Sequence, residues 1–145
     1  MLSALACALF GILTLVSGVH LYWGFGGLWP AKSELELART VVGGNGIENM
    51  PSAALTVVVA VLIFGASLFP LAWAHLLPLP DFVPSVLVFA GMIALTGVFL
   101  LRGLIGFTPY FAKMNAEEPF RTLDRKYFSP LCLILGIGFL ALTIV

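Results

Sequence analysis

Charged residues are scarce in this chain: seven Lys and Arg balance seven Asp and Glu, and together they make up 10% of its 145 residues. Soluble domains carry about a quarter charged residues, and a balanced net charge gives no basic surface for nucleic acid. Hydrophobic residues instead make up 61%. A chain this short cannot bury so much apolar surface inside itself. We therefore expect a single integral membrane domain whose partners are membrane lipids, not nucleic acid.

Cysteine and histidine are too few for the common metal and disulfide patterns. Cys7 and Cys132 lie near opposite ends of the chain without CxxC spacing, which favours neither a disulfide framework nor a zinc site. The glycine-rich segment 43–46 lacks the Lys-Ser/Thr of a phosphate loop. The two histidines, His20 and His75, are expected on opposite membrane faces, which disfavours a bis-histidine haem. We expect no cofactor.

Four apolar runs are long enough to cross a membrane, and they cover residues about 2–24, 51–75, 84–107 and 129–145. The fourth run, at about 17 residues, is at the lower limit for crossing. Ser129 followed by Pro130 is typical of a helix start, because serine is a favoured N-cap and proline suits the first helical position. Pro70, inside the second run, is expected to kink or end its helix near Phe69.

The charged residues gather in two connections between these runs. In the first, 31–50, the segment SELE at 33–36 matches a capping box. Apolar residues recur at helical spacing from within this segment onward, which predicts a short amphipathic helix on the membrane surface. These residues are Leu35, Ala38, Val41 and Val42. The second connection, 108–128, is the longest charged segment of the chain.

The positions of the basic residues predict the orientation. Six of them fall in the two connections, and Arg102 lies at the edge of the same side; the six are Lys32, Arg39, Lys113, Arg121, Arg125 and Lys126. The opposite side, with both termini and the 76–83 turn, has no Lys or Arg. The positive-inside rule then places both connections in the cytoplasm and both termini outside, in the inner membrane.

The fold class expected from these features is all-α. We predict a four-helix transmembrane bundle with short amphipathic surface helices in the two cytoplasmic connections. Small residues should let the helices approach closely. The candidates for such contacts are Gly91, Gly97, Gly136 and Gly138.

Polar residues from three spans are expected at one depth. His20 and Arg102 lie about four residues before the cytoplasmic ends of their spans, and Cys132 about three residues into the fourth, which is some 5–8 Å below the interface. Ionisable groups at this depth usually face the bundle interior or a polar cavity. Asp124 is the expected counter-ion of Arg102. The alternatives are that Arg102 reaches the lipid headgroups and that His20 bonds a backbone carbonyl.

We therefore hypothesise one ligand-binding pocket in the cytoplasmic leaflet. Its expected lining is His20, Trp23, Arg102, Asp124, Tyr127, Ser129 and Cys132. Three function classes are compatible with it. The first binds an amphiphilic ligand, meaning a lipid, an isoprenoid or a quinone. The second is an accessory or structural subunit that contacts another membrane protein or a second copy of itself. The third is a small membrane enzyme that uses Cys132 as a nucleophile or His20 as a proton shuttle.

Four segments resemble a known family. They are HLYWGFGGLWP at 20–30, LRG at 101–103 with Phe107, FRTLD at 120–124 and YFSPLC at 127–132. Together they are similar to the bacterial membrane family catalogued as domain of unknown function 3995, and the resemblance extends over nearly the whole chain. That family is described as small multi-spanning membrane proteins without an assigned activity. The resemblance therefore implies a membrane location and no reaction.

Overall fold

The computed structural model describes residues 2–80 and 82–144, and this part of the chain is all-helical. Asp81, in the predicted turn, and Val145, at the end of the fourth predicted span, lie outside the described residues. Four helices in the described part are long and apolar enough to cross a membrane. They are α1 (Leu2–Gly24), α3 (Ala53–Trp73), α4 (Ser85–Ile105) and a continuous helical segment Phe120–Ile144. The predicted fold class is confirmed.

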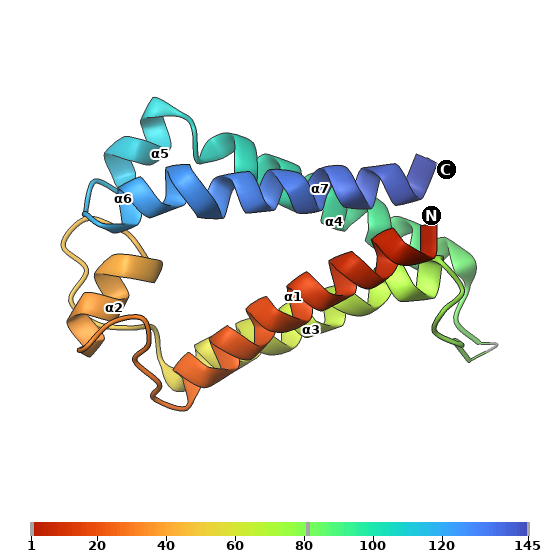
Figure 1. The fold of residues 1–145 in the computed structure, drawn as a ribbon, viewed down its shortest axis with the longest axis horizontal. Coiled ribbons are helices and arrows are strands. Elements are labelled where there is room, and N and C mark those ends of the chain that lie inside the picture. The colour runs from red at the N-terminus through yellow and green to blue at the C-terminus, as the bar shows by residue number, and fades with distance from the viewer. Residues whose placement is uncertain (1, 81, 145) are drawn as a thin grey trace.

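The long helices form two antiparallel pairs (Figure 1). One pair is α1 with α3, and the other is α4 with α7 (Ser129–Ile144). The pairs meet at the end where α1 starts and α7 finishes, and they diverge toward the opposite end (Figure 1). There the short helices lie: α2 (Glu34–Val41), α5 (Pro109–Met114) and α6 (Phe120–Leu123).

The buried core lies where the pairs meet. It joins residues 6–13 of α1 to residues 135–142 of α7, and it includes Met92 of α4. Its buried members are Ala6, Leu9, Leu13, Met92, Leu135, Phe139 and Leu142. The ring of Phe99 stacks on that of Phe139 at 5.6 Å between centroids. This close packing holds the two helix pairs together at one end of the molecule. At the other end the pairs diverge (Figure 1).

Glycines set the closest helix contacts. Leu100 of α4 packs on Gly136 of α7, and Leu133 of α7 packs on Gly103 of α4. Gly91 accommodates the ring of Phe69, and Gly138 lies against Leu9. The predicted contacts at Gly91, Gly136 and Gly138 are confirmed. The prediction for Gly97 is wrong, because a Cβ atom there would meet nothing within 4 Å.

Ser129 is not an N-cap, contrary to the prediction. Its backbone is helical (φ −66°, ψ −44°), and the chain runs without a break from α6 through a π-helical turn, η1 (Asp124–Phe128), into α7. Pro130 has no N–H, and its ring would crowd the carbonyl four residues earlier in an α-helix. The wider π turn before it removes that conflict. The fourth helix is therefore 25 residues long rather than about 17. Similarly, α3 continues through Pro70 to Trp73.

The two connections are folded and joined to each other. Ser33 caps α2 by accepting a hydrogen bond from the Glu36 N–H at 3.2 Å, as predicted. Leu37 and Ala38 form the buried face of α2, whereas Leu35, predicted on the apolar face, is 40% exposed. Asn45 then bridges to the second connection: its amide donates to the Lys113 carbonyl at 3.1 Å, and its Oδ1 accepts from the Ala116 N–H at 2.9 Å.

Candidate functional site

A buried polar network joins α4 to the start of the last helix. The Arg102 guanidinium forms an ion pair with the Asp124 carboxylate and donates to the Ser129 hydroxyl at 3.2 Å. Ser129 in turn donates to Asp124 Oδ2 at 2.7 Å. Asp124 is only 1% exposed, and the Phe111 ring lies 4.9 Å from the Arg102 guanidinium carbon. Asp124 is thus the counter-ion of Arg102, as predicted, and both carboxylate oxygens have partners.

The π turn places Asp124 and Ser129 on the same side of the helix. The Ser129 N–H donates to the Asp124 carbonyl, five residues back, which is the bond that defines a π turn. In a regular α-helix, residues five apart point in different directions, whereas residues three or four apart are neighbours. The proline that follows Ser129 therefore helps to build the network, because it favours the turn that aligns these two side chains.

Gly106, at the end of α4, leaves the room that the network occupies. A Cβ atom at this position would collide with the Ser129 hydroxyl and the Asp124 carboxylate. The backbone there is helical (φ −58°, ψ −23°), so alanine is acceptable to the main chain itself. The absence of a side chain is thus required by the network and not by the turn.

The Gly106→Ala variant is expected to lose about 1–3 kcal/mol of stability, because the added methyl group must displace a hydrogen-bonded pair. Thermal unfolding in detergent micelles measures the change. Gly18→Ala is the matched control, since a Cβ atom there meets nothing within 4 Å, and alanine in a helix interior gains up to about 1 kcal/mol over glycine. Equal melting temperatures for the two variants would contradict the role given to Gly106.

Beside this network lies a pocket of about 510 Å³ with a basic lining. Three basic residues, Lys113, Arg121 and Arg125, line it, with Phe107 and Phe111 among the apolar residues of its wall. Asp124 is the acidic residue among its described lining residues, and its charge is neutralised by Arg102. The pocket can therefore attract an anion.

His20 and Trp23 belong to a different part of the molecule. His20 Nδ1 lies 2.9 Å from the Val16 carbonyl, and its ring lies 5.2 Å from that of Trp23. The Trp23 indole donates to the Trp29 carbonyl at 2.8 Å. Both residues lie near the end of α1 that diverges from α4 and α7 (Figure 1). His20 therefore has a backbone carbonyl as its partner, which is the alternative given above. Neither His20 nor Trp23 joins the Arg102 network.

Tyr127 and Cys132 lie near the network without joining it. Tyr127 is 53% exposed, and the Lys126 ammonium lies 5.2 Å from its ring centroid. Cys132 is a partly buried free thiol inside α7. Because the helix is continuous, Cys132 lacks the helix N-terminus that the hypothesis of a reactive thiol requires. In residues 2–80 and 82–144, no three His, Cys, Asp or Glu side chains are grouped to hold a metal ion.

The seven residues predicted to line one pocket therefore do not form one site. The structure joins Arg102, Asp124 and Ser129, and it adds three basic residues that the depth argument omitted: Lys113, Arg121 and Arg125. The sequence signal for these three residues is the high density of charge in the second connection. That density predicts the orientation of the protein in the membrane but not a binding surface.

The comparisons with known proteins agree with the segments noted in the sequence. A family model with the description "Protein of unknown function (DUF3995)" matches residues 13–139. No curated protein and no solved structure matches the chain.

Proposed function

Since this chain belongs to the DUF3995 family of unknown function, we propose from its geometry that it binds the anionic headgroup of a membrane amphiphile in the basic pocket beside Arg102. The observation that carries this proposal is the lining of that pocket. Lys113, Arg121 and Arg125 are among the residues that line a volume of about 510 Å³, and the acidic side chain of the described lining, Asp124, is already paired with Arg102.

The chemistry of the lining favours a phosphate-bearing headgroup. Arginine presents paired N–H donors that match phosphate oxygens, and lysine adds a mobile point charge. An uncharged quinone, which the sequence analysis allowed for the predicted pocket, would leave the three cations of the basic pocket without a partner. The shared ligand chemistry is thus a phosphate next to an apolar chain, as in an anionic phospholipid or an isoprenoid phosphate.

The position of the pocket supports an amphiphile over a soluble anion. It lies between the end of α4 and the second charged connection, where an apolar span gives way to polar chain. Phe107 and Phe111 line it beside the basic residues, so a bound molecule contacts both polar and apolar wall. We place this end on the cytoplasmic side of the inner membrane, with both termini outside, on the strength of the basic residues in the two connections.

Hydrogen bonds from the first connection hold one wall of the pocket in place. Asn45 fixes the backbone at Lys113 and Ala116, and the Gly46 N–H donates to the Glu117 carboxylate at 3.2 Å. The Arg102 network fixes the opposite wall at Asp124. Less conformational entropy is lost on binding when the walls are already ordered.

The test removes the basic lining and measures the lipid that stays bound. The Arg121→Gln/Arg125→Gln variant is expected to retain at least tenfold less phosphate-bearing amphiphile than the wild type, because each charge-assisted hydrogen bond contributes about 1.5–3 kcal/mol. Mass spectrometry of the lipid released from purified protein identifies the ligand. Phospholipid and isoprenoid phosphate are distinguished there by mass.

The matched control is Lys32→Gln/Arg39→Gln, which removes the same charge from the first connection, outside the pocket. It should retain the ligand at wild-type levels. Equal loss from both variants would mean that any positive charge on this face attracts anionic lipid, and it would reject the pocket. Unchanged retention in the Arg121/Arg125 variant would reject it as well.

A further inference from the structure

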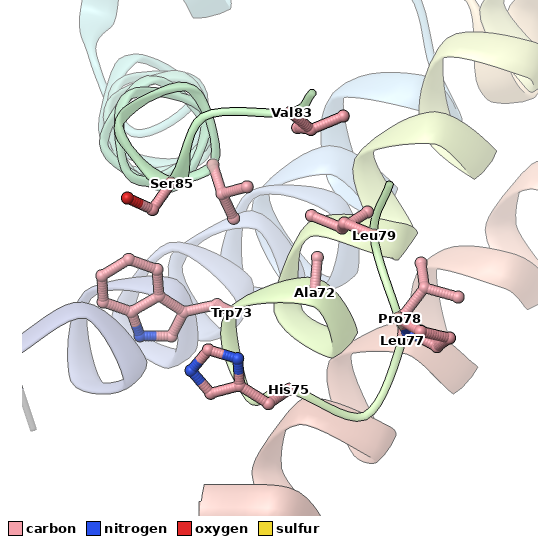
Figure 2. A pocket seen from close by; sticks show the side chains of 9 residues that line it. Ala72, Trp73, His75, Leu77, Pro78, Leu79, Val83 and Ser85 are labelled. Carbon is pink, nitrogen blue, oxygen red and sulfur yellow. The ribbon is translucent and has the colours of Figure 1, made fainter. Parts of the chain in front are cut away.

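A second pocket lies at the opposite end of the molecule, between α3, the loop that follows it and the start of α4 (Figure 2). Its volume is about 480 Å³. Trp73, His75 and Ser85 lie on one side of the opening, and the aliphatic side chains of Leu79 and Val83 lie on the other (Figure 2). The pocket therefore has a polar wall and an apolar wall.

The polar wall carries two exposed side chains that can form hydrogen bonds, those of His75 and Ser85. Within residues 2–80 and 82–144, neither the His75 imidazole nor the Ser85 hydroxyl has a hydrogen-bond partner. Trp73 is fixed between them: its indole donates to the Leu142 carbonyl at 2.8 Å, and its ring lies 5.8 Å from that of Phe89. A planar group entering the pocket would meet an ordered aromatic surface with the His75 and Ser85 side chains beside it.

His75 adopts a backbone conformation that favours glycine. Its φ is +56°, and it follows the last turn of α3, where the Leu76 N–H donates to the Leu71 carbonyl at 2.9 Å. Glycine is the usual residue at such a helix end, and other residues there cost free energy. A histidine at this position therefore costs free energy relative to glycine, and strain of this kind is often found at functional sites.

An apolar groove lies beside this pocket, along α3 and α4. It has a volume of about 350 Å³, is lined by Gly65, Leu68 and Leu87, and shares Ala72, Leu77, Leu79, Val83 and Val88 with the first pocket. A Cβ atom at Gly65 would meet nothing within 4 Å, so the glycine leaves open space along the groove. The two hollows together form one site with a polar end and an apolar end.

We propose that this site binds a quinone with an alkyl or prenyl chain, with its ring at Trp73, His75 and Ser85 and its chain along Gly65 and Leu68. The imidazole and hydroxyl would donate to the quinone oxygens, and the ring would lie against the indole. No Lys or Arg lines either hollow, which disfavours the phosphate-bearing ligands proposed for the other end. The site is separate from that pocket and does not depend on it.

The test uses the fluorescence of Trp73. The chain has three tryptophans, so Trp23→Phe/Trp29→Phe leaves Trp73 as the single reporter. This protein in phosphatidylcholine nanodiscs is titrated with a ubiquinone that carries two prenyl units. We expect saturable quenching that weakens at least tenfold in Gly65→Leu, because leucine fills the groove, and about fivefold in Ser85→Ala, the effect of one lost hydrogen bond.

Two further variants separate binding from folding. Gly11→Leu is the matched control, since a Cβ atom at Gly11 also meets nothing within 4 Å, and it should bind as the parent does. His75→Gly should raise the melting temperature while weakening quenching about fivefold, because the backbone relaxes and the donor is lost. Quenching that never saturates, or that is equal in Gly65→Leu and Gly11→Leu, would show partition into lipid only and overturn the proposal. The phosphate-site variant Arg121→Gln/Arg125→Gln should leave quinone binding unchanged.

Discussion

Replacing Arg102 by alanine is expected to lower the free energy of unfolding by about 3 kcal/mol, more than replacing Asp124 by asparagine. The two partners are unequally buried: the Asp124 side chain is 2% exposed and that of Arg102 is 35% exposed. Without Arg102, a buried carboxylate keeps only the Ser129 hydroxyl. Without the carboxylate, the guanidinium can turn toward water or headgroups on its flexible stem, so Asp124→Asn should cost about 1–2 kcal/mol.

Equilibrium unfolding in mixed micelles with increasing SDS measures both values. The double variant Arg102→Met/Asp124→Leu should be more stable than Arg102→Ala, since it leaves no charge buried. Arg125→Ala is the control, because exposed charges usually contribute less than about 0.5 kcal/mol. If Asp124→Asn proved more damaging than Arg102→Ala, the burial asymmetry would not govern this pair.

The Arg102–Asp124 pair could be predicted from the sequence because position along a helix converts directly into depth. Arg102 lies just inside the end of one span and Asp124 a few residues outside the start of the next, and a charge at the depth of Arg102 needs a partner. The same reasoning could not tell which helices are neighbours. His20 shares that expected depth but lies on α1, which pairs with α3 and diverges from α4 and α7 at this end (Figure 1).

The start of the last helix could not be predicted from the local sequence. Ser129 and Pro130 match an N-terminal signal, and nothing in their own composition distinguishes a helix start from a helix interrupted by a π turn. The difference is tertiary: Ser129 bonds Asp124 and Arg102 and packs close to Gly106. The basic pocket was missed because its lining combines the end of α4 with a connection whose shape depends on Asn45 contacts from a distant part of the chain.

Placing leucine at Gly136 is expected to cost about 3 kcal/mol, at the upper end of the range for an overpacked contact. A Cβ atom there would lie 2.7 Å from Leu100 side-chain atoms and 2.9 Å from the Leu100 backbone nitrogen. A side chain can move aside, but a helix backbone can yield only if α4 and α7 separate. The effect should therefore spread along the pair to the second close contact, where Leu133 packs on Gly103.

Gly97→Leu is the matched control, the same substitution at a helical glycine of α4 where a Cβ atom meets nothing within 4 Å. Its stability should be unchanged or up to about 1 kcal/mol higher, because leucine has the better helix propensity.

Separation of α4 from α7 would also pull Arg102, next to Gly103, away from Ser129 and Asp124. Gly136→Leu should thus reduce the bound phosphate amphiphile as well as the stability, although Gly136 does not line the pocket, whereas Gly97→Leu should reduce neither. Unfolding curves and lipid mass spectrometry on the same preparations test whether helix packing and the polar network are coupled. If a destabilised Gly136→Leu variant kept the lipid content of the wild type, they would not be coupled.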